Sequence, residues 1–209
     1  MSILLVAGLG NPGREYANTR HNAGFAVVDA LAARHALAWR MQARFEARLA
    51  RWERPGGATC IFAKPATFMN ESGRSLRALA DFYKVPLNRT IVAYDDLTID
   101  LGRLKISVRG SAGGHNGVAS VLSHLGEGFL RFRIGIGPKH PAQMDLKDFV
   151  LGTFDPAEQT LFENNLNTYT EGLGLLIEQG PDKAMSNLNR RTSHHDPDQT
   201  QVPRDLHPR

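Results

Sequence analysis

The chain opens with an apolar run, Ile3 to Ala7, that leads directly into a glycine-rich turn. Consecutive apolar residues ending at a glycine are typical of a buried strand in an α/β sheet. Gly8, Gly10 and Gly13 have the G-x-G-x-x-G spacing of a dinucleotide-binding loop. Such a loop passes at once into an apolar helix whose N-terminus faces the pyrophosphate. Residues 14–22 are polar instead and end in a histidine and an asparagine, which favours a loop that lines a reactive site.

Strand-like and helix-like segments alternate along the rest of the chain. Strand patterns occur at 2–8, 38–52, 58–64, 90–95, 103–108 and 131–136, and helical patterns at 22–36, 70–84, 117–125, 157–178 and 181–189. The turn Pro55-Gly56-Gly57 predicts that 38–52 and 58–64 form an antiparallel hairpin. The alternation predicts a single α/β domain: a mixed, mostly parallel twisted sheet, helices on both faces, and the hairpin inserted.

Composition sets the limits of this domain. Hydrophobic residues make up 42% of the 209 residues, enough for a sizeable core over residues 1–191. Apolar residues almost vanish beyond that point, so residues 192–209 are predicted to be a disordered basic tail. Residues 138–147 are predicted to be a mobile loop.

Charge and cysteine content bear on the partner and the compartment. The net charge of +4 favours an anionic partner such as a nucleic acid, although a mildly basic enzyme with a small acidic substrate fits as well. The single cysteine, Cys60, excludes a disulfide framework and predicts a reducing cytoplasm. We find no signal peptide and no run of about 18 apolar residues that could span a membrane.

Polar clusters follow several of the predicted strands. They are Asn11 to Asn22, Lys64 to Gly73, Tyr94 to Asp96, and Gly110 to Gly117. In an open α/β sheet the functional crevice lies beyond the carboxyl ends of the strands, so these clusters are expected to converge. Each cluster alone also has a structural explanation. Asn70 could cap a helix, a strand-terminal acid could cap the next element, and Gly113-Gly114 could serve only a tight turn.

The motifs narrow the chemistry to water activated by a histidine. Ser111 is not part of a G-x-S-x-G nucleophile elbow, and the sequence has no H-E-x-x-H or Cys/His metal motif. A histidine can activate water when a carboxylate fixes its tautomer. His21 with Asp95 is the best such pair, and asparagine amides could hold a carbonyl or a developing oxyanion.

Longer motifs resemble those of the bacterial-type peptidyl-tRNA hydrolases over about residues 3–190. They are Asn11-Pro12-Gly13 with Tyr16, Thr19 to Gly24, Lys64-Pro65 with Phe68 to Gly73, Tyr94 to Leu97, and Gly110 to Gly117. The resemblance implies one α/β domain that hydrolyses the ester between a peptide and the 3′-terminal ribose of tRNA, recycling tRNA from aborted translation. It also implies a cytoplasmic monomer whose partner is peptidyl-tRNA, with no metal, no cofactor and no membrane association.

The resemblance assigns roles to particular residues. His21 would be the general base, and Asp95 would accept its hydrogen bond. The substrate-binding set would comprise Asn11, Asn70 and Asn116 on the peptide backbone and scissile carbonyl, Tyr16, Phe68 and Met69 along the cleft near the 3′ end, and His115 supporting the loop that carries Asn116.

Contacts with the tRNA phosphates are implied for Lys105 and Arg133, and residues 138–147 would act as a lid. One position departs from the family pattern. The family often has a second basic residue two positions after Lys105, whereas this chain has Ser107. Arg103 or Arg109 could compensate.

Two other functions remain open. A non-catalytic RNA-binding protein on the same fold would bind RNA without turnover, although His21, Asp95 and the asparagines argue against it. A nucleotide-dependent oxidoreductase would bind NAD saturably, although Pro12 and the delayed helix argue against it. A hydrolase of the predicted kind is expected to spare free aminoacyl-tRNA.

Overall fold

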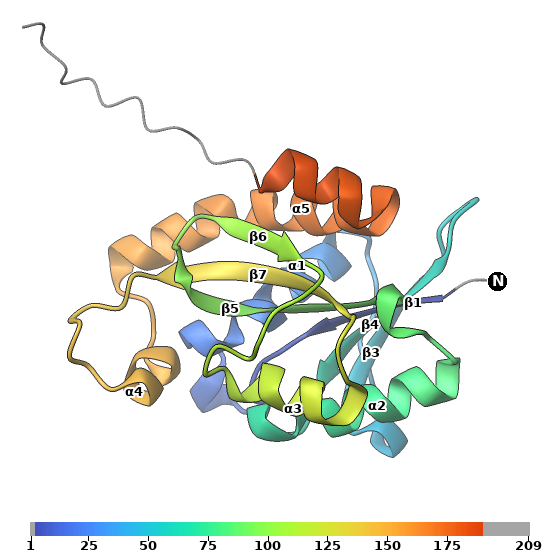
Figure 1. Ribbon diagram of the computed structural model, residues 1–209, viewed down its shortest axis with the longest axis horizontal. Helices are drawn as coiled ribbons and strands as arrows, with labels where there is room; N and C mark the ends of the chain where they lie inside the picture. The colour runs from blue at the N-terminus through green and yellow to red at the C-terminus, as the bar shows by residue number, and fades with distance from the viewer. Residues whose placement is uncertain (1–2, 190–209) are drawn as a thin grey trace, which may run out of the picture.

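The computed structural model describes residues 3–189 and is built around one seven-stranded sheet of order β2-β3-β4-β1-β5-β7-β6 (Figure 1). The strands are β1 (Ile3–Gly8), β2 (Arg40–Gln42), β3 (Ala47–Trp52), β4 (Thr59–Pro65), β5 (Thr90–Asp100), β6 (Leu104–Ser107) and β7 (Leu130–Gly137). Strands β4, β1, β5 and β7 are parallel, whereas β2, β3 and β6 join antiparallel at the two edges. The predicted mixed sheet with an inserted hairpin is confirmed, and its parallel part is the centre.

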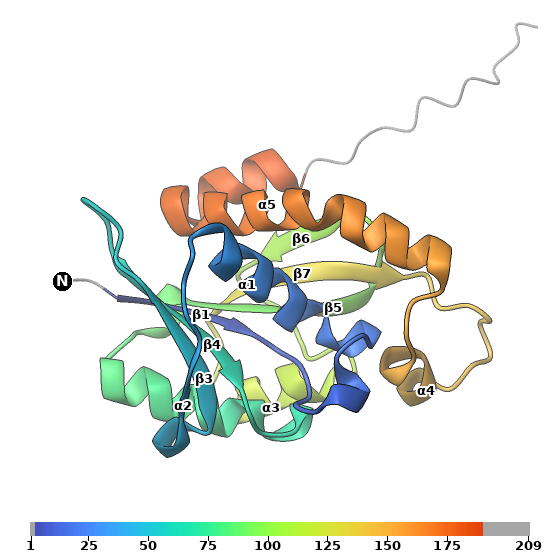
Figure 2. The same cartoon turned by 180° about the vertical axis from the view of Figure 1, so that it is seen from behind.

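Helices cover both faces of the sheet (Figure 2). The helices are α1 (Ala23–Arg34), α2 (Ser72–Tyr83), α3 (Asn116–Leu125), α4 (Leu146–Leu151) and α5 (Pro156–Leu188), and the short 3-10 turns are η1 (Arg14–Tyr16), η2 (Arg20–Asn22), η3 (Ala43–Phe45), η4 (Met69–Glu71) and η5 (Leu87–Arg89). One apolar cluster joins the sheet to α1 and α5, and a second joins it to α2 and α3. The predicted helices on both faces are therefore confirmed.

Glycine lets α1 lie directly against the sheet. A Cβ atom at Gly24 would lie 2.4 Å from the carbonyl oxygen of Ala93 and 2.6 Å from that of Leu9. These neighbours are backbone atoms, which cannot move aside. Moreover α1 begins only at Ala23, so its N-terminus does not follow the glycines of the first turn as a dinucleotide-binding helix would.

The prediction of a single strand over 38–52 is wrong. The turn η3 divides this segment into β2 and β3, and Glu46, which follows the turn, has a left-handed backbone with φ of 47°. Phe45 of this turn is buried between the sheet and α2, and its carbonyl oxygen accepts a hydrogen bond from Ser75 Oγ. Apolar and polar residues continue to alternate through the turn, so the sequence pattern did not indicate that the strand is interrupted there.

The bounds of several other elements differ from the prediction. Asn70 is not a helix cap, because it lies in η4 and α2 begins at Ser72. Strand β5 runs on to Asp100 instead of ending at Asp95. The segment 138–147 is not all loop, because α4 begins at Leu146.

The carboxyl-terminal part of the described chain agrees with the prediction. The helical segment α5 is broken at Gly180, whose φ and ψ of 78° and 176° are not helical, so two helices meet there as expected. The predicted tail, 192–209, lies outside the described residues. Within residues 3–189, the helices are too short or too polar to cross a bilayer.

Candidate active site

The candidate site lies at the switch point of the sheet, where β1 ends beside β5. The pairing of β1 with β5 stops at Gly8 and Ala93, while β5 continues to Asp100 beside β7. Asp95 therefore lies just beyond the end of β1. The chain leaves β1 through α1 toward β4 and returns from β4 through α2 to β5, and open sheets of this kind bind ligands at such a crevice.

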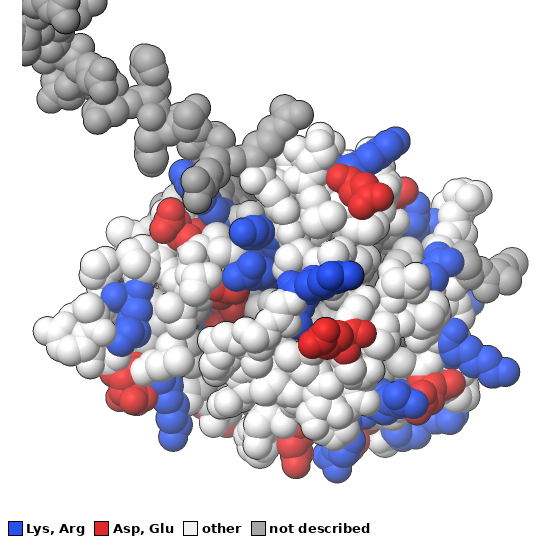
Figure 3. Space-filling model, in the orientation of Figure 1, with Lys and Arg blue, Asp and Glu red and all other residues white. Residues whose placement is uncertain are grey.

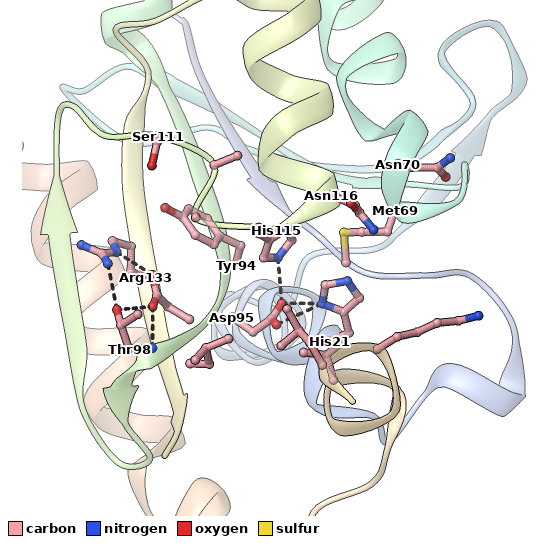
Figure 4. Close-up of a pocket in the computed structure, with 18 of the residues that line it drawn as sticks. His21, Met69, Asn70, Tyr94, Asp95, Thr98, Ser111, His115, Asn116 and Arg133 are labelled. Atoms are coloured by element: carbon pink, nitrogen blue, oxygen red, sulfur yellow. Dashed lines mark hydrogen bonds and ion pairs between the residues drawn. The ribbon is translucent and has the colours of Figure 1, made fainter. Parts of the chain in front are cut away.

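A cleft of ≈ 860 Å³ opens at this point. Of the predicted site residues it is lined by Asn11, His21, Phe68, Met69, Asn70, Asp95, His115, Asn116 and Arg133. Figure 4 shows several of them converging from η2, η4, β5 and the start of α3. Tyr16 and Lys105 are not among the lining residues. Tyr16 lies on η1, so its role in the cleft stays a prediction.

Three of the predicted clusters lie at or directly after the ends of parallel strands. The fourth cluster, Gly110 to Gly117, reaches the cleft by a different route. Strand β6 is antiparallel to β7, and its last residue, Ser107, pairs with Arg131 near the start of β7. The glycine-rich loop after β6 therefore begins at the opposite end of the sheet and crosses back to the cleft before α3 (Figure 1). Arg131 is buried and holds this loop through the carbonyl oxygens of Gly110 and Ser111.

Two histidines donate to one buried carboxylate. His21 Nδ1 lies 3.0 Å from both oxygens of Asp95, and His115 Nε2 lies 3.0 Å from Oδ1 (Figure 4). Asp95 is 3% exposed and His21 7%. Burial by itself would raise the pKa of Asp95, but its electrostatic interactions and hydrogen bonds with His115 and His21 hold that pKa far below its usual range.

Hydrogen bonds from the start of helix α3 determine which ring nitrogen of His115 carries the hydrogen. The Nδ1 atom of His115 accepts hydrogen bonds from the backbone N–H groups of Gly117 (3.1 Å) and Val118 (3.3 Å), so its imidazole caps the helix. A neutral imidazole that accepts at Nδ1 carries its hydrogen on Nε2. His115 is therefore held as a donor to Asp95, and it positions the carboxylate as well as the loop.

The same hydrogen bonds bear on a possible metal. The ligand atoms of His21, Asp95 and His115 lie within 4.8 Å of one another, a spacing that could suit two-histidine, one-carboxylate coordination. However, His115 needs its Nε2 hydrogen while Nδ1 accepts from the helix, which leaves no lone pair for an ion. The geometry fits a hydrogen-bonded relay better than a metal centre.

The amide of Asn11 is oriented from two sides. Its backbone N–H donates to Asn22 Oδ1 (2.8 Å), and its carbonyl oxygen accepts from Asn22 Nδ2 (3.0 Å). Its side-chain Oδ1 accepts the N–H of Met69 (2.8 Å). Since the oxygen is occupied, the Nδ2 group of Asn11 is the part left to donate to a ligand in the cleft.

The remaining predicted contacts form the rim. Asn70 and Asn116 are exposed, and Phe68 is 59% exposed. Met69 is buried, and its sulfur fills the space beside Gly117, where a Cβ atom would lie only 2.4 Å away. The rim therefore combines two exposed amides with an exposed aromatic ring, and the buried thioether of Met69 lies beside them.

The predicted phosphate contacts lie at the β6 side of the cleft. Lys105 is exposed and sits opposite Arg133 in the β6–β7 register, and basic side chains gather over this region in Figure 3. Arg133 donates to Asp96 (2.8 Å) and Thr98 (3.3 Å), so it is partly engaged within the protein. Of the two suggested substitutes for a basic residue at Ser107, Arg109 lines the cleft.

Sequence reasoning placed only part of one wall of the cleft, since the predicted lid, 138–147, ends in the first turn of α4. Helix α4 contributes Leu146, Lys147, Val150 and Leu151 to the lining. A helix of six residues has too few turns to show a clear period, so only its N-cap, Asp145, gave a local signal. Arg131, which holds the loop before α3, had no signal of its own.

Comparison with known proteins places these features in a family. The model of the family described as peptidyl-tRNA hydrolase matches residues 5–196. This chain belongs to the peptidyl-tRNA hydrolase family. Relatives named peptidyl-tRNA hydrolase include one from Gloeobacter violaceus, 44% identical over 95% of this chain and 100% of its own length. Another, from Carboxydothermus hydrogenoformans, is 43% identical over 90% of this chain and 99% of its own length.

Solved structures of the peptidyl-tRNA hydrolase family share the fold. The crystal structure of peptidyl-tRNA hydrolase from Acinetobacter baumannii superposes with a TM-score of 0.83 at 34% identity, covering 90% of this chain and 94% of the other. The predicted family, fold class and enzyme class are therefore confirmed. The roles of individual residues stay predictions.

Proposed function

We propose that this chain hydrolyses the ester of peptidyl-tRNA by a water molecule that His21 activates. The observation that carries the proposal is the contact of His21 Nδ1 with both oxygens of Asp95 inside the cleft. With Asp95 ionised, Nδ1 carries the hydrogen and the neutral imidazole keeps a lone pair on Nε2. That nitrogen can take a proton from water, and the adjacent carboxylate stabilises the imidazolium that forms.

The proton then has a path to the leaving group. Attack of hydroxide on the ester carbonyl gives a tetrahedral intermediate with a negatively charged oxygen. The Nδ2 group of Asn11 and the amides of Asn70 and Asn116 are the candidate donors to this oxygen and to the peptide backbone. Collapse of the intermediate breaks the bond to the ribose oxygen, which receives the proton held on His21 Nε2.

The biological substrate follows from the family. We propose that it is peptidyl-tRNA from aborted translation, so that hydrolysis returns free tRNA. The exposed Lys105 and the cleft residues Arg109 and Arg133 support recognition of a polyanion. Action in the cytoplasm as a monomer, without metal or cofactor, stays a prediction.

The test is release of the acyl group from N-acetyl-aminoacyl-tRNA by purified protein. Wild type should release it, and His21→Ala should lower kcat by roughly 100- to 10,000-fold because the general base is lost. His35→Ala is the matched control, since His35 stacks on Trp52 at the end of α1, away from the cleft. Unblocked aminoacyl-tRNA should be cleaved far more slowly.

Two outcomes would contradict the proposal. Wild-type turnover in His21→Ala would exclude His21 as the base. Tight tRNA binding with no hydrolysis by the wild-type protein would favour the non-catalytic RNA-binding alternative.

A further inference from the structure

Arg20 directly precedes His21, yet its side chain binds a distant part of the chain. Its Nη1 donates to the carbonyl oxygens of Thr153 (2.8 Å) and Phe149 (3.3 Å), and its Nη2 pairs with Glu158. Its backbone N–H donates to Gly152 O (3.0 Å). All of these partners lie in residues 149–158, which run from the end of α4 into the first turn of α5.

The environment makes this contact strong and specific. The Arg20 guanidinium lies 4.5 Å from the ring centre of Phe149 and 5.2 Å from that of Phe154, and its side chain is 10% exposed. A planar guanidinium bonds several acceptors in fixed directions while its flat face stacks on rings, a combination that the point charge of a lysine does not provide. Glu158 also accepts the N–H of Asp155 (2.9 Å) in the capping box of α5.

Helix α4 depends on contacts of this kind. A helix of six residues is not stable by itself in water, and the loop 138–145 precedes it. Arg20 binds its last turn through the carbonyl oxygen of Phe149, and the neighbouring residues Val150 and Leu151 line the cleft. The position of this wall is thereby linked to the turn η2, which carries His21.

We propose that Arg20 is a positioning residue that fixes α4, one wall of the cleft, relative to His21. The proposal rests on the proposed function, since it concerns the geometry of the same hydrolysis. Arg20 touches no substrate in this scheme. Arg20 holds α4 at a fixed position relative to His21. A displacement of this helix by about 1 Å can lower the rate by up to about 100-fold.

The first experiment replaces Arg20 with glutamine and measures kcat and KM on N-acetyl-aminoacyl-tRNA. Arg20→Gln should lower kcat/KM by about tenfold or more. The matched control is Asp29→Asn, which breaks a partly buried ion pair with Lys64 away from the cleft. Asp29→Asn should leave kcat/KM unchanged even if it lowers the melting temperature.

A double-mutant cycle separates positioning from general destabilisation. If Arg20 acts through α4, its effect on kcat/KM should depend on the wall, so Arg20→Gln and Val150→Ala should be non-additive by at least about threefold. Arg20→Gln and Phe68→Ala should be additive, because Phe68 belongs to the rim beside η4. Additive effects with Val150→Ala would overturn the proposal.

A milder variant covers the case in which Arg20→Gln does not fold. Glu158→Gln keeps an oxygen for the N–H of Asp155 but removes the charge facing Arg20, and should lower kcat/KM by up to about fivefold. Amide hydrogens of residues 146–151 should exchange faster in this variant than in wild type. Unchanged exchange and unchanged kcat/KM in a folded variant would overturn the proposal. If wild type itself releases no acyl group, the proposed function fails instead.

Discussion

At the scale of single residues, the site is organised by where protons are held. Asp95 receives N–H groups from His21 and His115, and the α3 backbone keeps His115 in the form that donates. The carboxylate of Asp95 therefore orients the imidazoles of both His21 and His115, which differ in the hydrogen bonds they can still form. His21 keeps a nitrogen for water, whereas both nitrogens of His115 are occupied.

The first prediction concerns Asp95→Asn. An amide has one acceptor oxygen, and its NH₂ group would face one of the two histidine donors. His21 would then rotate or adopt the other tautomer, and kcat should fall by at least about 100-fold. The measurement is single-turnover hydrolysis of N-acetyl-aminoacyl-tRNA. Asp100→Asn, at the exposed end of the same strand, should keep wild-type kcat, and an equal loss in both variants would contradict the assignment.

At the scale of elements, close backbone contacts place the helices that carry the site. Helix α1 touches the sheet through Gly24, and α3 leaves room for Met69 through Gly117. The turn between β5 and β6 is held differently. There Tyr169 of α5 is fully buried, and its hydroxyl oxygen accepts the N–H of Gly102 (3.0 Å).

The second prediction compares glycines in two helices. Gly24→Ala should destabilise the fold by about 1–3 kcal/mol, because its Cβ would meet backbone that cannot yield. Gly174→Ala, in α5, meets nothing within 4 Å and should stabilise by about 0.5–1 kcal/mol through helix propensity. Urea unfolding midpoints test both. Similar shifts for the two variants would show that the backbone of Ala93 does not prevent a larger side chain at position 24.

The third prediction concerns alkaline stability. Burial raises the pKa of Tyr169 to about 12 from 10.0, although the N–H of Gly102 opposes the shift. The unfolded chain loses this proton first, so the stabilisation is complete below about pH 10 and is lost as pH rises toward 12. The loss amounts to about 2–3 kcal/mol.

Unfolding midpoints between pH 8 and 12 measure this loss. Tyr169→Phe should start about 1 kcal/mol less stable at pH 8 and decline less steeply above pH 10. Part of the decline should remain, because burial also raises the pKa of Tyr94. An unchanged slope in Tyr169→Phe would contradict the assignment.

At the scale of the whole molecule, the chain carries a net charge of +4. Basic side chains gather on the face that carries β6 (Figure 3), while the candidate catalytic residues lie at the carboxyl end of the parallel strands. In the proposed function, the tRNA would approach from this basic face. Association with a polyanion from this direction should weaken as salt rises.

The fourth prediction measures that dependence. Lys105→Gln should raise KM for N-acetyl-aminoacyl-tRNA and reduce the slope of log KM against log salt by about 0.7–0.9, the amount expected for one lost phosphate contact. Lys84→Asn serves as control, because Lys84 follows α2 at the other end of the sheet, and asparagine tolerates its left-handed backbone. An unchanged slope in Lys105→Gln would show that Lys105 contacts no phosphate.

Local signals in the sequence determined most elements and the residue types at the site. Apolar runs and helical periods depend on near neighbours, so β1, α1 and the break at Gly180 could be predicted. The motifs around His21, Asp95 and Asn116 likewise pointed to one cleft, which the structure contains.

Only the tertiary structure decided how distant segments meet. The antiparallel direction of β6 depends on its pairing with β7, and α4 is held by contacts with Arg20, which lies more than a hundred residues earlier. Neither leaves a periodic trace in its own segment, because the stabilising groups are elsewhere in the chain. The proton on His115 depends on both scales. Its Nδ1 accepts from backbone N–H groups only two and three residues later, whereas its Nε2 meets Asp95, twenty residues earlier, only in the folded sheet.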